Sequence, residues 1–399
     1  MSKPVVSQER GPRSRTPSGV FALWALGFRP FYLLASIFAA LSIPLWVAQY
    51  AGFLPMPYVR STALHGHEML FGYTLAVITG FLFTAGRNWT GKPTPTGALL
   101  AAYTLLWIAS RVLVLTRWET AAAIVNAAFP VAVAVGLAVP LATSRNQRNY
   151  FFVALLLSLG LVVVALHLSF LGMFAWPELA SLELGLDLVL FIVAVMGGRV
   201  IPMFTNNAIP GTQATRLPLV ERLALGSVLA LLGADLLQMP DTVIAVIAVI
   251  AALAHGVRLY LWQPWRTRGT PLVWVLHAAC GWVVVYLVLR ALAALGLVAE
   301  SLALHALTMG VIGGMTIGMM TRTARGHTGR ALVADGFEVA CYVLIQMAAL
   351  IRVFGGIFLP GVYLATVIGS GICWSSGFAI YAVRYWPILS RARIDGKPG

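Results

Sequence analysis

Apolar residues lie along this chain in long blocks separated by short polar segments. Each block approaches the roughly 20 residues that an α-helix needs to cross a hydrocarbon layer about 30 Å thick. Over that length in lipid, only a helix satisfies its own backbone hydrogen bonds. The blocks cover residues 31–50, 67–85, 98–116, 119–142, 150–173, 180–204, 221–238, 241–260, 272–296, 302–321, 336–358 and 361–385. The pattern predicts an all-α polytopic membrane protein with about twelve transmembrane helices.

Composition and charge agree with a chain embedded in the lipid bilayer. Hydrophobic residues make up 60% of the 399 positions and charged residues only 10%, against about 25% charged residues in an ordinary soluble domain. Most of the 27 basic residues fall in alternate loops and in the two terminal segments. Because Lys and Arg collect on the cytoplasmic side, we expect an inner-membrane protein with both termini cytoplasmic. The net charge of +14 therefore requires no nucleic-acid partner.

The helical blocks also set the domain boundaries. Residues 1–20, rich in Pro, Ser, Gly and Arg, predict a disordered cytoplasmic tail. Residues 21–390 form the predicted twelve-helix domain, and residues 391–399 form a second cytoplasmic tail. The three cysteines are isolated inside predicted helices, which does not support disulfides, iron–sulfur clusters or covalently attached haem.

A gapless internal repeat joins the second predicted helix to the tenth. Residues 64–92 align with residues 302–330, and the identical pairs are Leu64 and Leu302, His67 and His305, Gly72 and Gly310, Gly80 and Gly318, Arg87 and Arg325, Thr90 and Thr328, and Gly91 and Gly329. Chance would give roughly two or three identities in so short a window. The two helices are eight apart and run in the same direction, so the repeat predicts three four-helix units.

Ionisable residues within the helices gather in one predicted outer layer. The layer contains four histidines, two acids and three arginines, namely His65, His67, His167, His305, Glu68, Asp187, Arg111, Arg290 and Arg352. Such residues are costly in lipid and often functional. Neutral imidazole ligates haem iron and copper, and the arginine fork suits carboxylates such as haem propionates.

The repeated histidines, His67 and His305, could ligate one iron from opposite faces of a porphyrin. The competing interpretation is that they cap helices or hydrogen-bond to lipid headgroups. His65 lies two positions before His67 and faces the other side of the helix, so the sequence leaves open which of the two is a ligand. His327 aligns with Trp89 in the repeat and is either solvated or a metal ligand.

Several segments resemble the NnrS family. They are Gly27 to Phe31 (GFRPF), His65 to Gly72 (HGHEMLFG), Asn88 to Gly91 (NWTG), Gly197 to Pro202 (GGRVIP) and Gly326 to Gly329 (GHTG). This resemblance implies a haem- and copper-containing bacterial membrane protein of nitric oxide metabolism that relieves nitrosative stress. It supplies no defined reaction.

The second predicted helix also looks, more distantly, like its counterpart in the haem-copper oxidase catalytic subunit. That resemblance implies a low-spin haem b held by His67 and His305. The oxidase copper centre has no counterpart here, because Asp187 stands on the sixth helix where that family has a histidine, and residues 221–238 contain none. Copper would need another site, among His65, Glu68, His167 and Asp187.

The leading expectation is a haem b protein that binds nitric oxide or iron–nitrosyl species, or transfers electrons from a donor such as quinol. Arg111 and Arg352 are the expected partners of the propionates. One alternative is a transporter of a small solute or metal, with Asp187, Arg199 and the outer histidines along its path. Another is a quinol-linked oxidoreductase. The sequence leaves open whether the protein is catalytic.

Overall fold

The computed structural model describes residues 21–50, 52–53 and 61–397. The predicted tail over residues 1–20 lies outside this part. The described residues form twelve helices, two of which are built in three parts, so the predicted all-α fold is confirmed. The ten undivided helices are α1 (Phe28–Tyr50), α4 (Gly97–Val114), α5 (Glu119–Thr143), α6 (Phe151–Phe170), α7 (Glu178–Ala208), α8 (Pro218–Leu236), α9 (Asp241–Leu261), α10 (Pro271–Ala294), α13 (Gly336–Phe358) and α14 (Tyr363–Ser390).

The two divided helices are the members of the sequence repeat, called here the repeat helices. The first consists of α2 (Ser61–His67), a π-helical turn η1 (Glu68–Thr74) and α3 (Leu75–Thr90). The second consists of α11 (Glu300–His305), a π-helical turn η4 (Ala306–Gly313) and α12 (Gly314–His327). Short 3-10 turns, η2 (Gln147–Asn149), η3 (Pro264–Thr267) and η5 (Pro360–Val362), lie in the connections.

Eleven of these twelve helices are long and apolar enough to cross a membrane. Helix α8 is the exception, because every 18-residue stretch of it contains Glu221, Arg222 and Asp235. Two of these charges are neutralised inside the bundle. Glu221 pairs with Arg258 at 2.9 Å and Asp235 pairs with Arg290 at 2.7 Å. Pairing of this kind lets charged side chains stay among apolar helices.

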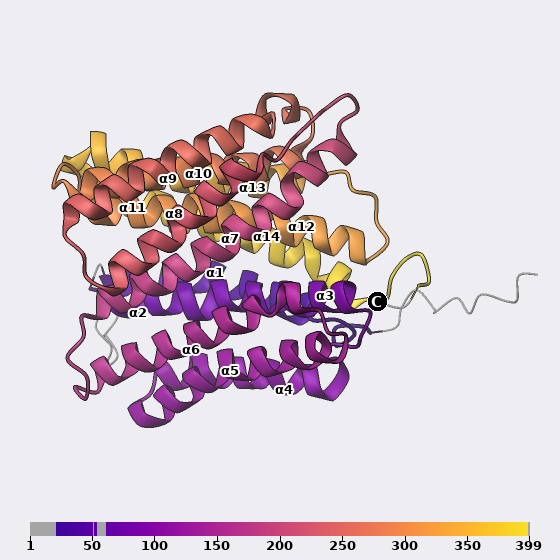
Figure 1. Ribbon diagram of the computed structural model, residues 1–399. Coiled ribbons are helices and arrows are strands. Elements are labelled where there is room, and N and C mark those ends of the chain that lie inside the picture. Colours follow the sequence, from indigo (N-terminus) through magenta and orange to yellow (C-terminus); the bar gives the residue numbers. More distant parts are fainter. Residues whose placement is uncertain (1–20, 51, 54–60, 398–399) are drawn as a thin grey trace, which may run out of the picture.

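The helices pack side by side in an order that follows the chain (Figure 1). Helices α4, α5 and α6 lie on one side of the bundle, and α8, α9 and α10 lie on the other. Helix α5 contacts α6, α9 contacts α10, and α14 returns to contact α1. Helices that follow one another in the chain are therefore neighbours in the bundle, which closes where α14 meets α1.

The two ends of the described chain lie together. Phe21 and Arg391 form an isolated antiparallel bridge, and the Ala22 amide donates to the Ser390 carbonyl at 2.7 Å. The Arg29 guanidinium donates to the Leu389 carbonyl at 2.9 Å. Because the described chain runs back and forth through an even number of helices, both ends lie on one side of the bundle. The opposite side, where α1 ends and α2, α7 and α11 begin, is called the far end below.

The backbone reproduces the sequence repeat. Each π-helical turn begins directly after the repeated histidine, η1 after His67 and η4 after His305. Near the other end, Gly91 and Gly329 both have positive φ, +64° and +77°, a conformation that glycine adopts without strain. Since π-helical turns are rare and frequent at functional sites, their matching positions direct attention to the two histidines.

Candidate functional site

A cavity of about 420 Å³ opens at the far end between the two repeat helices. Its walls come from α1, α2, η1, α7, α11, η4, α13 and α14, and most of its lining is apolar or aromatic. The aromatic wall includes Trp46, Tyr73 and Trp374. A volume of this size and a lining with few polar groups are typical of sites for small molecules and cofactors.

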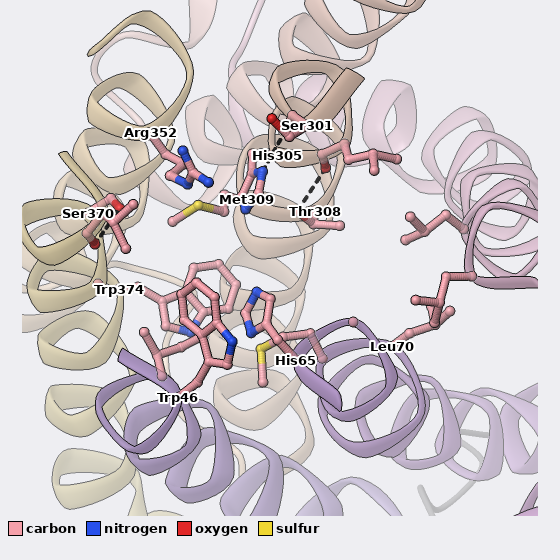
Figure 2. Close-up of a pocket in the computed structure, with 18 of the residues that line it drawn as sticks. Trp46, His65, Leu70, Ser301, His305, Thr308, Met309, Arg352, Ser370 and Trp374 are labelled. Atoms are coloured by element: carbon pink, nitrogen blue, oxygen red, sulfur yellow. Dashed lines mark hydrogen bonds between the residues drawn. The ribbon is translucent and has the colours of Figure 1, made fainter. Parts of the chain in front are cut away.

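Two histidines face this cavity, one from each repeat helix, and they are His65 and His305. Figure 2 shows both rings directed into the same space, with Met309 and Arg352 beside them. The His305 Nδ1–H donates to the Ser301 carbonyl at 2.5 Å. Such a bond fixes the ring orientation and leaves Nε2 as the atom available to a metal.

His65 is held differently. Its ring stacks on Trp46, with centroids 4.3 Å apart and planes inclined by 26°. Within the described part of the chain, no hydrogen bond fixes this ring. The two cavity histidines therefore differ in how firmly they are oriented: His305 by a backbone carbonyl, His65 by an aromatic face alone.

Arg352 brings a positive charge to the cavity wall. Its Nη2 donates to the Tyr363 hydroxyl at 2.7 Å, and the guanidinium lies over the Tyr363 ring. The Nη1 atom is buried and has no hydrogen-bond partner among the described residues. Although Glu183 and Glu300 also line the cavity, an unsatisfied guanidinium arm on its largely apolar wall suits an anionic group of a bound ligand.

His67 faces away from the cavity and belongs to a second group of residues. Its Nδ1 contacts Glu68 Oε1 at 2.7 Å, and its Nε2 lies 3.1 Å from the His167 Nε2. Arg111 Nη1 donates to the same Glu68 oxygen at 2.6 Å, and Nη2 donates to Asn126. These five residues, His67, Glu68, His167, Arg111 and Asn126, form the His67 cluster.

The structure therefore separates residues that the sequence had grouped. His67 and His305 were predicted to share one iron, yet they face different spaces. His65 and His67 are two residues apart on α2 and so point in nearly opposite directions, and it is His65 that faces the cavity with His305. His65 occupies the cavity side that the prediction gave to His67. Of the two expected propionate partners, Arg352 lines the cavity and Arg111 lies in the His67 cluster.

The His67 cluster does not supply a full set of copper ligands. The nitrogens of His67 and His167 are close enough to share a proton or one ion. Glu68 Oε1, however, already contacts both His67 and Arg111. Across the described residues, no group of three or more histidine, cysteine or acidic side chains is arranged to hold a metal ion.

Nearly the whole described chain matches one known protein family. The model of the NnrS protein family matches residues 22–393, which include both repeat helices, the cavity and the His67 cluster. The chain belongs to the NnrS family. No curated protein matches it. Membership of the NnrS family is consistent with a membrane protein linked to nitric oxide.

Two further candidates in this NnrS-family chain lie away from the cavity. Asp187 is buried on α7, next to Asp235 and near Arg290, and it contacts none of the four histidines of the predicted layer among the described residues. His327 ends α12 at the opposite end of the bundle, with its ring 5.7 Å from that of Phe28. Neither residue joins another predicted ligand.

Sequence reasoning missed several residues of the cavity wall. Trp46 and Trp374 belong to no motif that marks them as site residues, but both line the cavity. Tyr73 also lines it, and its hydroxyl makes a short hydrogen bond with Thr316 that ties the first repeat helix to the second. The contact between His305 and the Ser301 carbonyl left no signal in the sequence, because every residue one turn before a histidine offers such a carbonyl.

Proposed function

We propose that this protein holds a haem b in the far-end cavity and takes part in the response to nitric oxide. The observation that carries this proposal is the pair of imidazoles, His65 and His305, that face one apolar cavity from equivalent helices. His65 replaces His67 as the expected ligand, since both ring nitrogens of His67 are engaged by Glu68 and His167.

The residues present fit such a group. Bis-histidine haem needs two imidazole nitrogens on opposite sides of a flat apolar space, and its propionates need cations or hydrogen-bond donors. The cavity offers the two imidazoles, and the buried Arg352 Nη1 lacks a partner among the described residues. When bound, haem supplies a one-electron iron centre that can take nitric oxide. The copper that the family implies has no complete ligand set in the described residues, so it has no role in this proposal.

The unequal support of the two histidines suggests how nitric oxide would gain access. If both ligate, one must leave before nitric oxide binds. His305 is fixed by the Ser301 carbonyl, whereas His65 rests on the face of Trp46. In a bound haem, His305 would be the firmly held ligand and His65 the one that could be displaced.

The first test is the optical spectrum of the purified protein. We expect a Soret band that is lost or strongly reduced in His305→Ala, because the anchored ligand is gone. In His65→Ala we expect the band to persist with a five-coordinate character and faster binding of nitric oxide. His67→Ala should leave the band unchanged.

The control is His277→Ala. His277 contacts Thr205 at 2.8 Å near the start of α10, at the end of the bundle opposite the cavity, and its loss should not change the spectrum. A wild-type protein without a Soret band would overturn the haem proposal and favour a transporter. A band that depends on His67 but not on His65 would overturn the ligand assignment. Consumption of nitric oxide driven by quinol, followed with an electrode, would show an oxidoreductase.

A further inference from the structure

Four carboxyl groups surround one guanidinium at the far end. Arg290 on α10 contacts Asp235 on α8 at 2.7 Å, Glu300 on α11 at 3.0 Å and Glu183 on α7 at 3.7 Å. Asp187 lies one turn beyond Glu183 on α7 and contacts Asp235. These five residues form the Arg290 cluster.

The Arg290 cluster differs from the other buried ion pairs in its balance of charge. Glu68 pairs with Arg111, Glu221 with Arg258, and Glu338 with Arg325, so each of these carboxylates has its own guanidinium. The Arg290 cluster has four acids and one arginine. One of the three excess negative charges can stay on Glu300, whose side chain is 50% exposed. The other two lie inside a low-dielectric bundle, where they would be strongly unfavourable, so protons or a cation must compensate them.

The contacts within the cluster favour protons. Asp187 contacts Asp235, and Glu183 contacts Glu300, each in a side-chain hydrogen-bonding arrangement. Two ionised carboxylates have no proton to share, so a hydrogen bond within either pair requires one of its members to be protonated. Asp187 Oδ2 is buried and accepts no hydrogen bond from an N–H or hydroxyl group of the described residues. The Arg290 guanidinium already supplies the cation that three of the acids contact, and no group arranged to hold a metal ion is found in the described part of the chain.

The exposure of the side chains forms a gradient from water into the bundle. Glu300 is 50% exposed, Glu183 19% and Asp235 7%, and Asp187 as a residue is only 2% exposed. Glu183 and Glu300 also line the cavity that contains the two histidines. The acids therefore lead from an accessible position at the cavity to a closed one behind it.

We propose that the Arg290 cluster is a proton-binding and proton-exchange site for the cavity. The outer pair, Glu300 and Glu183, holds one proton and exchanges it with water. The inner pair, Asp235 and Asp187, holds a second proton, which it gains or loses through Glu183. The charged or titratable groups that face Asp187 are these acids together with Arg290 and Tyr286 of α10.

This proposal does not depend on a cofactor in the cavity. The ligand of the Arg290 cluster is a proton, which moves between carboxyl groups without any change in oxidation state. If an electron reaches the cavity, the cluster offers a nearby group that can release or accept a proton to compensate the charge.

Infrared spectroscopy of the protein in lipid nanodiscs tests the site directly. At neutral pH we expect a C=O stretching band of protonated carboxyl groups, which shifts when H₂O is replaced by D₂O. Asp187→Asn and Asp235→Asn should each remove part of this band; the amide resembles a protonated acid in shape and still donates to its partner. Glu183→Gln should slow the deuterium exchange of the remaining band by about tenfold or more.

The control is Glu178→Gln, on the exposed first turn of the same helix, which should leave the band and its exchange unchanged. Absence of the band from the wild-type protein would overturn the proposal without any variant. So would a band that is the same in Asp187→Asn, Asp235→Asn and Glu183→Gln. A normal carboxyl band in a protein without a Soret band would overturn the haem proposal alone.

Discussion

The two repeat helices share a backbone but place their aligned histidines in different surroundings. After His67 comes Glu68, a buried acid that contacts His67 Nδ1 and is held by Arg111. After His305 comes Ala306, which offers no acceptor, so His305 Nδ1 donates to the Ser301 carbonyl instead. A charge-assisted bond to a carboxylate is stronger than a bond to a neutral carbonyl. The residue after the aligned histidine therefore differs together with its surroundings. Where it is Glu68, the histidine belongs to a polar cluster; where it is Ala306, the histidine faces the cavity.

The arginines follow the same division. In the His67 cluster, Arg111 neutralises a buried carboxylate at 2.6 Å. At the cavity, Arg352 has a tyrosine hydroxyl as its partner and one unpaired arm among the described residues. The first arrangement is complete within the protein, whereas the second leaves a cation for a ligand. The His67 cluster is therefore closed, and the cavity, which both repeat helices line, is open to a ligand.

The largest expected effect on stability comes from removing Arg111 from the His67 cluster. Arg111→Leu leaves Glu68 as a buried charge without its guanidinium, and we expect a loss of about 3–5 kcal/mol of stability. Arg352→Leu removes a bond to a neutral hydroxyl and should cost only about 1–3 kcal/mol. Thermal or denaturant unfolding in detergent measures both.

Two variants control this comparison. The exposed Arg117→Leu should change stability by less than about 0.5 kcal/mol. In the double variant Glu68→Ala with Arg111→Leu, no charge is left unpaired, so it should be more stable than Arg111→Leu alone. Equal losses of stability in Arg111→Leu and Arg352→Leu would contradict the distinction between a closed His67 cluster and an open cavity.

A smaller effect is expected at the aligned glycines Gly72 and Gly310. A Cβ at Gly310 would lie 2.4 Å from the Trp282 ring, and one at Gly72 would lie 2.7 Å from Phe38. Gly310→Ala and Gly72→Ala should each destabilise the protein by about 1–3 kcal/mol through overpacking, seen as a lower Tm. Gly226→Ala, where no atom lies within 4 Å of the added carbon, is the matched control. A Tm for Gly310→Ala as high as that of the control would contradict the close packing.

The smallest effect tests how His305 is held. Because His305 donates to the backbone carbonyl of Ser301, Ser301→Ala keeps the bond and should change stability by less than about 0.5 kcal/mol. The optical spectrum should be unchanged as well. A shifted Soret band in Ser301→Ala would mean that the serine hydroxyl, rather than the carbonyl, orients the ring.

Much of the fold was readable from local sequence. The apolar blocks predicted the twelve helices, and the prediction is confirmed, because hydropathy over about 20 residues depends on the segment itself. The gapless alignment of residues 64–92 with 302–330 predicted equivalent helices, and the structure adds a matching π-helical turn to each. Those turns were not predicted, since no local pattern distinguished them from ordinary helix.

The candidate site depended more on contacts between distant residues. The sequence placed His65, His67, His167 and His305 in one layer, because depth follows from position along each helix. It did not tell which ring turns toward the cavity, since that rests on the rotation of α2 and on side chains far away in the chain. The partner of His67 is His167, one hundred residues on, and Trp46 supports His65 from another helix.

Asp187 also shows the difference between what the local sequence determines and what helix packing decides. Its burial within α7 followed from the sequence, and a polar role was expected there. Its neighbours Asp235 and Arg290 come from α8 and α10, and neither is near it in sequence. Helix formation and depth are local properties that the chain carries in each segment. The choice of partners is made only when the helices pack and each buried charge must find its counterpart.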